Sequence, residues 1–230
     1  MKARQLPLAV QLPAAADFAT FVPGPNAEAL AAVARLAETA AGALCLHGPR
    51  GSGRTHLLQA AVRDVHRRGG QAMYLALPEW RDPGLLEGLE VLDLVALDGM
   101  DRHAGDPRWE EALFDLFNRL REGGRALVFA LDRPPAEAGF RLPDLTSRLG
   151  WGPVYALRPL RGPALVEALQ RHARLRGLEL PADVATYLLR RERRDLAHLV
   201  ALLDRLDRAA LAARRRLTIP FVREVLGGEA

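Results

Sequence analysis

The amino-acid sequence predicts an α/β fold in which a parallel β-sheet lies between helices, followed by a C-terminal part made of helices alone. Two observations predict the sheet: a glycine-rich loop joins an apolar run to a helix, and further apolar runs alternate with helical patterns. Beyond residue 161, leucines recur at helical spacing and no strand pattern follows. At 230 residues the chain can hold both parts.

The glycine-rich loop has the sequence GPRGSGRT at residues 48–55, directly after the apolar run at 43–47. In loops of this phosphate-binding type, glycines let several backbone N–H groups point at one phosphate, and the next helix adds the partial positive charge of its N-terminus. Arg54 stands where the pattern has lysine, so the charge is kept but its position changes. A turn that binds nothing is the alternative. The expected nucleotide-binding residues here are Gly48, Gly51, Gly53, Arg54 and Thr55.

The segments before the loop are less regular. Residues 1–13 contain two prolines and no helical periodicity, which predicts an extended tail. A turn with Phe18 and Phe21 follows, whose rings either cover a nucleotide base or anchor the core. An alanine-rich helix is expected at residues 27–41. Cys45, the only cysteine, lies in the first strand, and a lone cysteine agrees with a reducing compartment.

A Walker B strand is predicted after the loop. A helix at 55–67 is followed by apolar runs at 71–77 and 91–98, which suit strands covered on both faces. The second run ends in Asp98, whose carboxylate can reach Mg²⁺ together with the Thr55 hydroxyl, or can merely cap a turn. Gly99 stands where active ATPases of this type carry a second acid. We therefore expect weak ATP hydrolysis or none, with Asp101 as a less favoured base.

The next strand carries a predicted sensor. Asp106 and Pro107 begin a helix as N-cap and first residue, and the strand at 126–131 follows. Asp132 comes directly after that strand, beside the Walker B strand, so we expect it to act as sensor 1 near the γ-phosphate. Arg148 lies in a loop-rich segment at 142–152, before a short strand at 154–157.

The sequence predicts three parts of the chain, of which the helical region beyond residue 161 is the last. They are an N-terminal tail at 1–12, an α/β nucleotide-binding domain at 13–160 and a helical lid domain at 161–230. In the lid we expect one helix with Leu165, Leu169, His172 and Leu175 on its buried face, and a longer helix from about Leu196.

Charge and hydropathy indicate which classes of protein this chain can belong to. The net charge of +4 permits contact with nucleic acid or an acidic partner, but the arginines alternate with Asp and Glu along helices, so solvated helix faces explain most of them. No apolar run approaches the roughly 20 residues that span a bilayer, and the N-terminus lacks a secretion signal. A cytoplasmic location and no membrane contact are therefore expected.

The order of phosphate loop, Walker B strand, sensor strand, arginine-bearing loop and C-terminal helices resembles that of AAA+ proteins. Within this order, five motifs resemble the bacterial replication initiator DnaA and, more closely, its shortened relatives, the Hda family. The resemblance covers nearly the whole chain. The motifs are F-x-x-F-x-x-G-x-N at 18–26, GRTHLL at 53–58, DRPP at 132–135, L-x-SRL-x-WG at 145–152 and LTIPFV at 217–222.

The resemblance implies regulatory inactivation of DnaA, which prevents re-initiation of DNA replication. A protein of this family, tethered to the DNA-loaded sliding clamp (the β subunit of DNA polymerase III), stimulates hydrolysis of DnaA-bound ATP. It implies that Arg148 is an arginine finger acting in trans and that Asn26 belongs to the nucleotide site, with ADP or ATP and Mg²⁺ as cofactors. It also implies that the tail residues Gln5, Leu6 and Leu8 bind the clamp.

Two positions depart from the family pattern. The tail continues with Ala9-Val10 where a Pro-Leu or aromatic anchor is usual, and Ala197 stands at the position of the sensor 2 arginine, with Arg194 as a substitute. A homo-oligomer is allowed, and sequence-specific DNA binding is not expected, since no DNA-reading domain follows the lid before Ala230.

The alternative functions are an autonomous helicase-loader ATPase, another DnaA-like replication factor and a nucleotide-free scaffold. Arg148 is alternatively an ion-pair partner of Asp144.

Overall fold

The computed structural model describes residues 16–192 and 196–227, and a five-stranded parallel sheet lies at its centre. Each pair of neighbouring strands is parallel, so the predicted sheet is confirmed. The carboxyl ends of all strands therefore meet at one edge, where the loops after β1, β3 and β4 lie next to one another. The strands are arranged in the order β2 (Ala72–Ala76), β3 (Leu94–Asp98), β4 (Ala126–Leu131), β1 (Gly42–His47) and β5 (Val154–Ala156).

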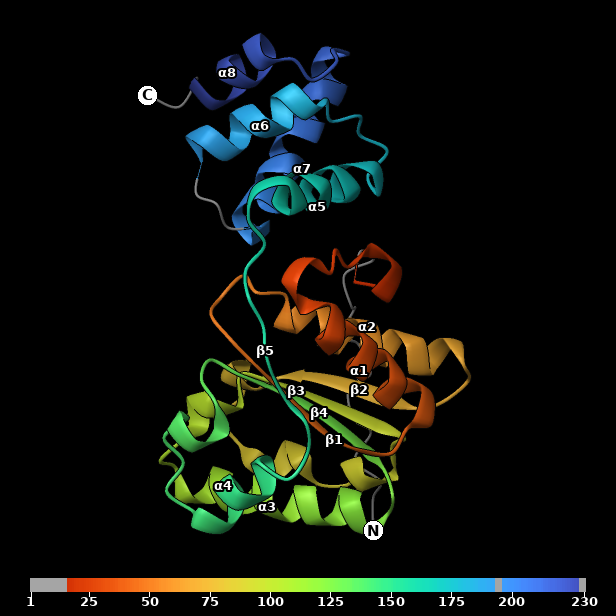
Figure 1. Ribbon diagram of the computed structural model, residues 1–230, viewed down its shortest axis with the longest axis vertical. Helices are drawn as coiled ribbons and strands as arrows, with labels where there is room; N and C mark the ends of the chain where they lie inside the picture. The colour runs from red at the N-terminus through yellow and green to blue at the C-terminus, as the bar shows by residue number, and fades with distance from the viewer. Residues whose placement is uncertain (1–15, 193–195, 228–230) are drawn as a thin grey trace.

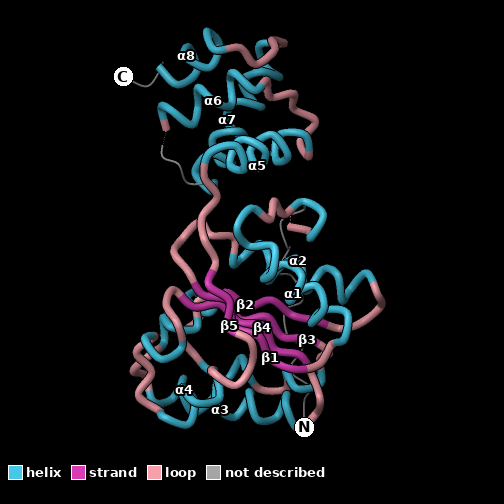
Figure 2. The backbone as a smooth tube through the Cα atoms, in the orientation of Figure 1, coloured by secondary structure: helices cyan, strands magenta, loops and turns pink. Residues whose placement is uncertain are grey.

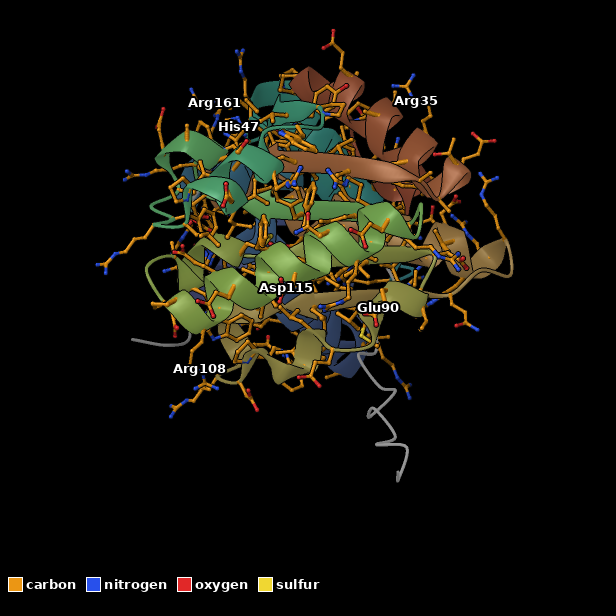
Figure 3. All side chains as sticks on the ribbon, turned by 90° about the horizontal axis from the view of Figure 1, so that it is seen from below. Arg35, His47, Glu90, Arg108, Asp115 and Arg161 are labelled. Atoms are coloured by element: carbon orange, nitrogen blue, oxygen red, sulfur yellow. The ribbon has the colours of Figure 1, made fainter. Side chains whose placement is uncertain are left out.

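Helices cover both faces of the sheet (Figure 1). Each face has its own apolar core, and the core under α3 is built around Trp109, Phe117 and Phe129. Because both faces are covered, β4 is buried at every position, as its unbroken apolar run predicted. Figure 3 shows the molecule from below, with α3 across the front and Asp115 on it. One face carries α1 (Ala27–Thr39) and α2 (Arg54–Arg67), and the other carries α3 (Pro107–Glu122) and α4 (Pro143–Leu149).

Two sequence-based expectations on secondary structure were wrong. The segment at 142–152 contains helix α4, because Pro143 fits the first turn of a helix and Leu145 and Leu149, four residues apart, are both buried beside α3. The strand expected at 91–98 begins only at Leu94, since a 3₁₀ turn occupies Leu89–Val91.

The C-terminal helices form a bundle with a separate apolar core, joined to the sheet by a single linker after β5 (Figure 2). This confirms the predicted helical part, while the boundaries at residues 12 and 160 stay predictions. Leu165 and Leu169 are buried as expected, but Leu175 is 49% exposed because α5 ends at Arg174. The bundle consists of α5 (Gly162–Arg174), α6 (Ala182–Arg191), α7 (Leu196–Ala213) and α8 (Ile219–Gly227).

Within the two described ranges, every helix is too short or too polar to cross a membrane.

Helix α5 contacts the segment that precedes α1. The Nη1 atom of Arg171 donates to the carbonyl oxygens of Ala19 at 2.9 Å and Phe21 at 3.3 Å. The ring of His172 lies edge-on to the ring of His56 on α2, with 6.3 Å between centroids. These contacts hold the helical bundle above the helix that follows the glycine-rich loop.

We expect the stability of the protein to depend on pH through His172. Burial, with His56 and Arg176 nearby, lowers the pKa of this 9%-exposed ring from 6.5 to about 4. Since the folded-state pKa is the lower one, protonation favours the unfolded chain. Stability should be complete above pH 6.5 and fall by on the order of 2 kcal/mol as the pH drops towards 4.

Urea unfolding between pH 7 and 4 measures this loss. The His172→Gln variant should show a flatter profile than the natural protein. Equal slopes for the natural protein and the His172 variant would contradict the assignment.

Candidate functional site

The glycine-rich loop turns from the carboxyl end of β1 into α2, as predicted. Gly48, Gly51 and Gly53 have φ angles of 151°, 80° and 100°, which side-chain-bearing residues rarely adopt. A Cβ atom on Gly48 would overlap the carbonyl oxygen of Leu157, and one on Gly53 would lie 2.8 Å from the ring of Phe21. The loop can therefore be built only from glycine at these two positions.

The loop leaves polar groups available to a ligand. Helix α2 begins after Gly53, and no side chain caps its first N–H groups. Ser52 is 3% exposed, and its hydroxyl has no hydrogen-bond partner among the described residues. Unsatisfied N–H groups at a helix N-terminus attract anions. The residues present thus fit a phosphate group.

The two predicted magnesium ligands lie together. The hydroxyl of Thr55, in the first turn of α2, donates to Oδ2 of Asp98 at 2.6 Å. Tyr74 of the neighbouring strand β2 donates to the same oxygen at 2.9 Å. Burial, followed by the charge of Asp98, raises the pKa of the Tyr74 hydroxyl, so it stays a donor. A hydroxyl beside a carboxylate suits Mg²⁺, which prefers oxygen ligands.

Arg54 is paired with the predicted sensor. Its Nη2 atom lies 2.6 Å from Oδ1 of Asp132, and its Nη1 atom donates to the carbonyl oxygen of Leu131. The guanidinium therefore lies along the end of β4 and its charge is compensated there. Contact of Arg54 with a phosphate stays a prediction.

The structure also shows why no second acid follows Asp98. Gly99 has a φ of 69°, and a Cβ there would lie 2.9 Å from Pro78. Asp101, the alternative base, accepts a hydrogen bond from the backbone N–H of Asp132 at 3.0 Å. Its carboxylate thus anchors the end of β4.

Asn26 connects two segments of backbone. Its Nδ2 atom donates to the carbonyl oxygen of Arg158 at 2.9 Å, and its Oδ1 atom accepts from the N–H of Arg158 at 2.8 Å. Asn26 is 3% exposed and fixes the linker between β5 and α5. The predicted contact between Asn26 and a nucleotide stays a prediction.

A cavity of about 690 Å³ lies between the loop and the helical bundle. Its size suits a cofactor site. Two of its arginines, Arg161 and Arg190, were not found from the sequence because neither belongs to a motif. In Figure 3 the label of Arg161 lies on the same side of the view as that of His47, the last residue of β1. The lining residues are Arg50, Gly51, Pro159, Leu160, Arg161, Gly162, Leu165, Val166, Thr186, Leu189 and Arg190.

Arg148 lies far from this cavity, at the opposite edge of the sheet. Its guanidinium is 3.9 Å from the ring centroid of Trp151. Trp151 in turn lines a smaller cavity with Gly42 and Leu127, at the amino ends of β1 and β4. The ion pair between Arg148 and Asp144 that we considered is not formed, and no other described carboxylate pairs with this arginine.

Several predicted residues are not tested by the structure. Gln5, Leu6 and Leu8 of the expected tail lie outside the described ranges, as does Arg194. The side chain of Ala197 is likewise not described.

Comparisons with known proteins agree with this geometry. The family model described as "Hda, lid domain" matches residues 164–226, and the model of the bacterial DnaA ATPase domain matches residues 12–80. Together they cover the glycine-rich loop, β1, α2 and the helical bundle.

Solved structures with the same fold include two replication initiators and a motor protein. Domain III of DnaA from Thermotoga maritima superposes with a TM-score of 0.82 at 22% identity, covering 94% of this chain and 97% of that one. AMPPCP-bound DnaA from Aquifex aeolicus gives 0.71 at 23%, covering 87% and 67%. RuvB from Thermotoga maritima gives 0.67 at 19%, also covering 87% and 67%. At these identities the likeness establishes the AAA+ fold.

Proposed function

This chain belongs to the DnaA-related AAA+ proteins of the Hda family, and from that premise we propose that it is a regulatory inactivator of DnaA. In this proposal the protein is tethered to the DNA-loaded sliding clamp and stimulates hydrolysis of the ATP held by DnaA. The observation that carries the proposal is Arg148, a guanidinium without a described carboxylate partner at the sheet edge opposite the chain's own glycine-rich loop.

The position of Arg148 requires a partner. Strand β1 runs six residues from the edge near Trp151 to the loop, and a strand of that length spans roughly 20 Å. An arginine side chain cannot bridge this distance through the sheet. Arg148 therefore acts on a nucleotide bound by a neighbouring subunit, where its charge stabilises the charge that develops on the γ-phosphate.

We further propose that the loop of this chain binds an adenine nucleotide with Mg²⁺. The glycines and the N-terminus of α2 hold the phosphates, and Thr55 with Asp98 holds the metal ion, which when bound neutralises phosphate charge. ADP is preferred, because the salt bridge to Asp132 engages the Arg54 guanidinium that would otherwise contact a γ-phosphate. Hydrolysis by this chain is slow or absent, since Gly99 stands in place of a second acid and Asp101 is held at the end of β4 by the backbone N–H of Asp132. The same absence argues against an autonomous helicase loader.

A reconstituted reaction tests the proposed function. ATP-bound DnaA is mixed with DNA-loaded clamp, and phosphate release is followed with and without this protein. Release should be slow without it and fast with it, and omission of the clamp should remove most of the effect. Equal release in the presence and absence of the protein would exclude the proposal.

Nucleotide binding should depend on Thr55 and Asp98. Alanine at either position removes an oxygen that holds Mg²⁺, so we expect ADP affinity in the presence of Mg²⁺ to fall by about tenfold or more. Titration calorimetry with and without Mg²⁺ measures this. Thr39→Ala and Asp144→Ala, outside the site, serve as controls. Natural affinity in both site variants would mean that the metal is held elsewhere.

Clamp binding should depend on the N-terminal tail. Deletion of residues 1–10, or Gln5→Ala, should abolish capture of the clamp because an extended peptide of this kind fills pockets on its partner. The melting temperature should change little, since the extended tail that the sequence predicts carries few core contacts. Clamp capture by the truncated protein would assign the contact to another surface.

A further inference from the structure

The turn after α4 places Trp151 against Arg148. The backbone N–H of Trp151 donates to the carbonyl oxygen of Arg148 at 3.1 Å, and that of Gly150 donates to Ser147 at 3.2 Å. Gly152 then passes so close to β1 that a Cβ would overlap the carbonyl oxygen of Ala43. The chain is therefore held on both sides of Trp151, and the indole folds back over the residue three positions earlier.

The contact holds the guanidinium without neutralising it. An aromatic face attracts a cation through its quadrupole but carries no net charge. Arg148 lies 3.9 Å from the indole centroid, and its Nη1 atom is buried with no hydrogen-bond partner among the described residues. Arg54 is held in the opposite way, by the carboxylate of Asp132 at 2.6 Å. Of these two arginines, only Arg148 has a charge that no described carboxylate compensates.

The indole of Trp151 contributes little to the packing of the described chain. Trp151 is 58% exposed, so it adds little to the apolar core under α3. Its other cationic neighbour is Arg121 of α3, 5.0 Å from the ring centroid, and Phe114 adds a more distant aromatic face 5.9 Å from the Arg148 guanidinium. The ring is thus placed on the surface between two arginines.

We propose that Trp151 is a positioning residue for Arg148: its indole face fixes the guanidinium in one orientation and leaves its charge free for the phosphate of a partner-bound nucleotide. This inference rests on the proposed function. A long side chain at the surface otherwise samples many rotamers, and a reacting group displaced by about 1 Å can lose on the order of 100-fold in rate.

A first test observes the contact itself and needs no partner. In the NMR spectrum of the protein, the Nε–H proton of Arg148 should be shifted upfield by the ring current of Trp151. The Trp151→Leu variant keeps apolar bulk but removes the ring, so the shift should disappear, and Trp151→Phe should keep part of it. An Arg148 signal unchanged by Trp151→Leu would overturn the inference.

A second test measures stimulation of DnaA-bound ATP hydrolysis against the concentration of this protein. Trp151→Leu should lower the maximal rate by about tenfold and leave the half-saturating concentration and the melting temperature unchanged. Trp151→Phe should recover most of the rate, and Trp80→Leu, which removes an exposed indole elsewhere, should have no effect. A raised half-saturating concentration with an unchanged maximum would make Trp151 a docking contact and overturn the inference.

A double-mutant cycle separates this inference from the proposed function. If Trp151 acts through Arg148, then Trp151→Leu should add no loss in an Arg148→Ala background. Losses that multiply would overturn the positioning role alone. Full stimulation by Arg148→Ala itself would refute the role of Arg148 and with it the positioning role of Trp151, whereas no stimulation by the natural protein would overturn the proposed function.

Discussion

Replacing Arg148 by alanine is expected to lower the stimulation of DnaA-bound ATP hydrolysis by about 10³-fold or more, the range for a transition-state arginine supplied in trans. No described carboxylate compensates the charge of Arg148. Its removal therefore takes away the stabilisation that this cation gives to the charge developing on the γ-phosphate. ADP binding, clamp binding and the melting temperature should stay close to those of the natural protein. Arg148 lies at the edge of the sheet opposite the glycine-rich loop.

Two further variants make this result specific. Arg148→Lys should recover little, because an ammonium group lacks the planar fork that binds two phosphate oxygens. Arg108→Ala removes an exposed arginine of α3 and should stimulate normally. Phosphate release in the reconstituted reaction is the measurement. An Arg148→Ala protein with natural melting temperature and natural stimulation would refute the role of this residue.

The part of the site that the sequence predicted is the part fixed by backbone topology. A strand, a glycine-rich loop and a helix in that order place Gly48 at the carboxyl end of β1, and parallel strands bring Asp98 to the same edge. The hydrogen bond between Thr55 and Asp98 follows from this placement. Local spacing and strand direction sufficed, because neither depends on side-chain rotamers.

The parts that the sequence did not predict depend on side chains from distant segments. The pairing of Arg54 with Asp132 joins residues 78 positions apart, and the hydrogen bond from Tyr74 to Asp98 crosses from one strand to the next. The sequence did not reveal that the amide of Asn26 pairs with the backbone of Arg158, and its contact with a nucleotide stays a prediction. Each contact selects one partner among several of similar chemistry, and that choice is made by packing.

A buried carboxylate holds the start of α4, the helix that contains Arg148. Glu110 of α3 is 2% exposed. It accepts hydrogen bonds from the N–H groups of Gly105 at 2.6 Å, Arg141 at 2.9 Å and Leu142 at 2.6 Å. Leu142 is the N-cap residue of α4, so Glu110 fixes the start of the helix that ends beside Arg148.

The Glu110→Gln variant is expected to lose about 3 kcal/mol of unfolding free energy. The substitution keeps the shape of the side chain but replaces one acceptor oxygen with an NH₂ group, which faces backbone N–H donors and leaves at least one of them buried without a partner. Urea unfolding followed by circular dichroism measures the loss. Stimulation per folded molecule should also fall, because the start of α4 is released.

The neighbouring Glu111→Gln variant separates this effect from a change of net charge. Glu111 lies on the same helix and is exposed, so its substitution alters the charge equally and removes no buried acceptor. Its unfolding midpoint should match that of the natural protein. If both variants unfolded at the natural midpoint, the three backbone hydrogen bonds would contribute nothing to stability. Equal losses in both would instead assign the effect to charge, and α4 would have to be positioned by the packing of Leu145 and Leu149 alone.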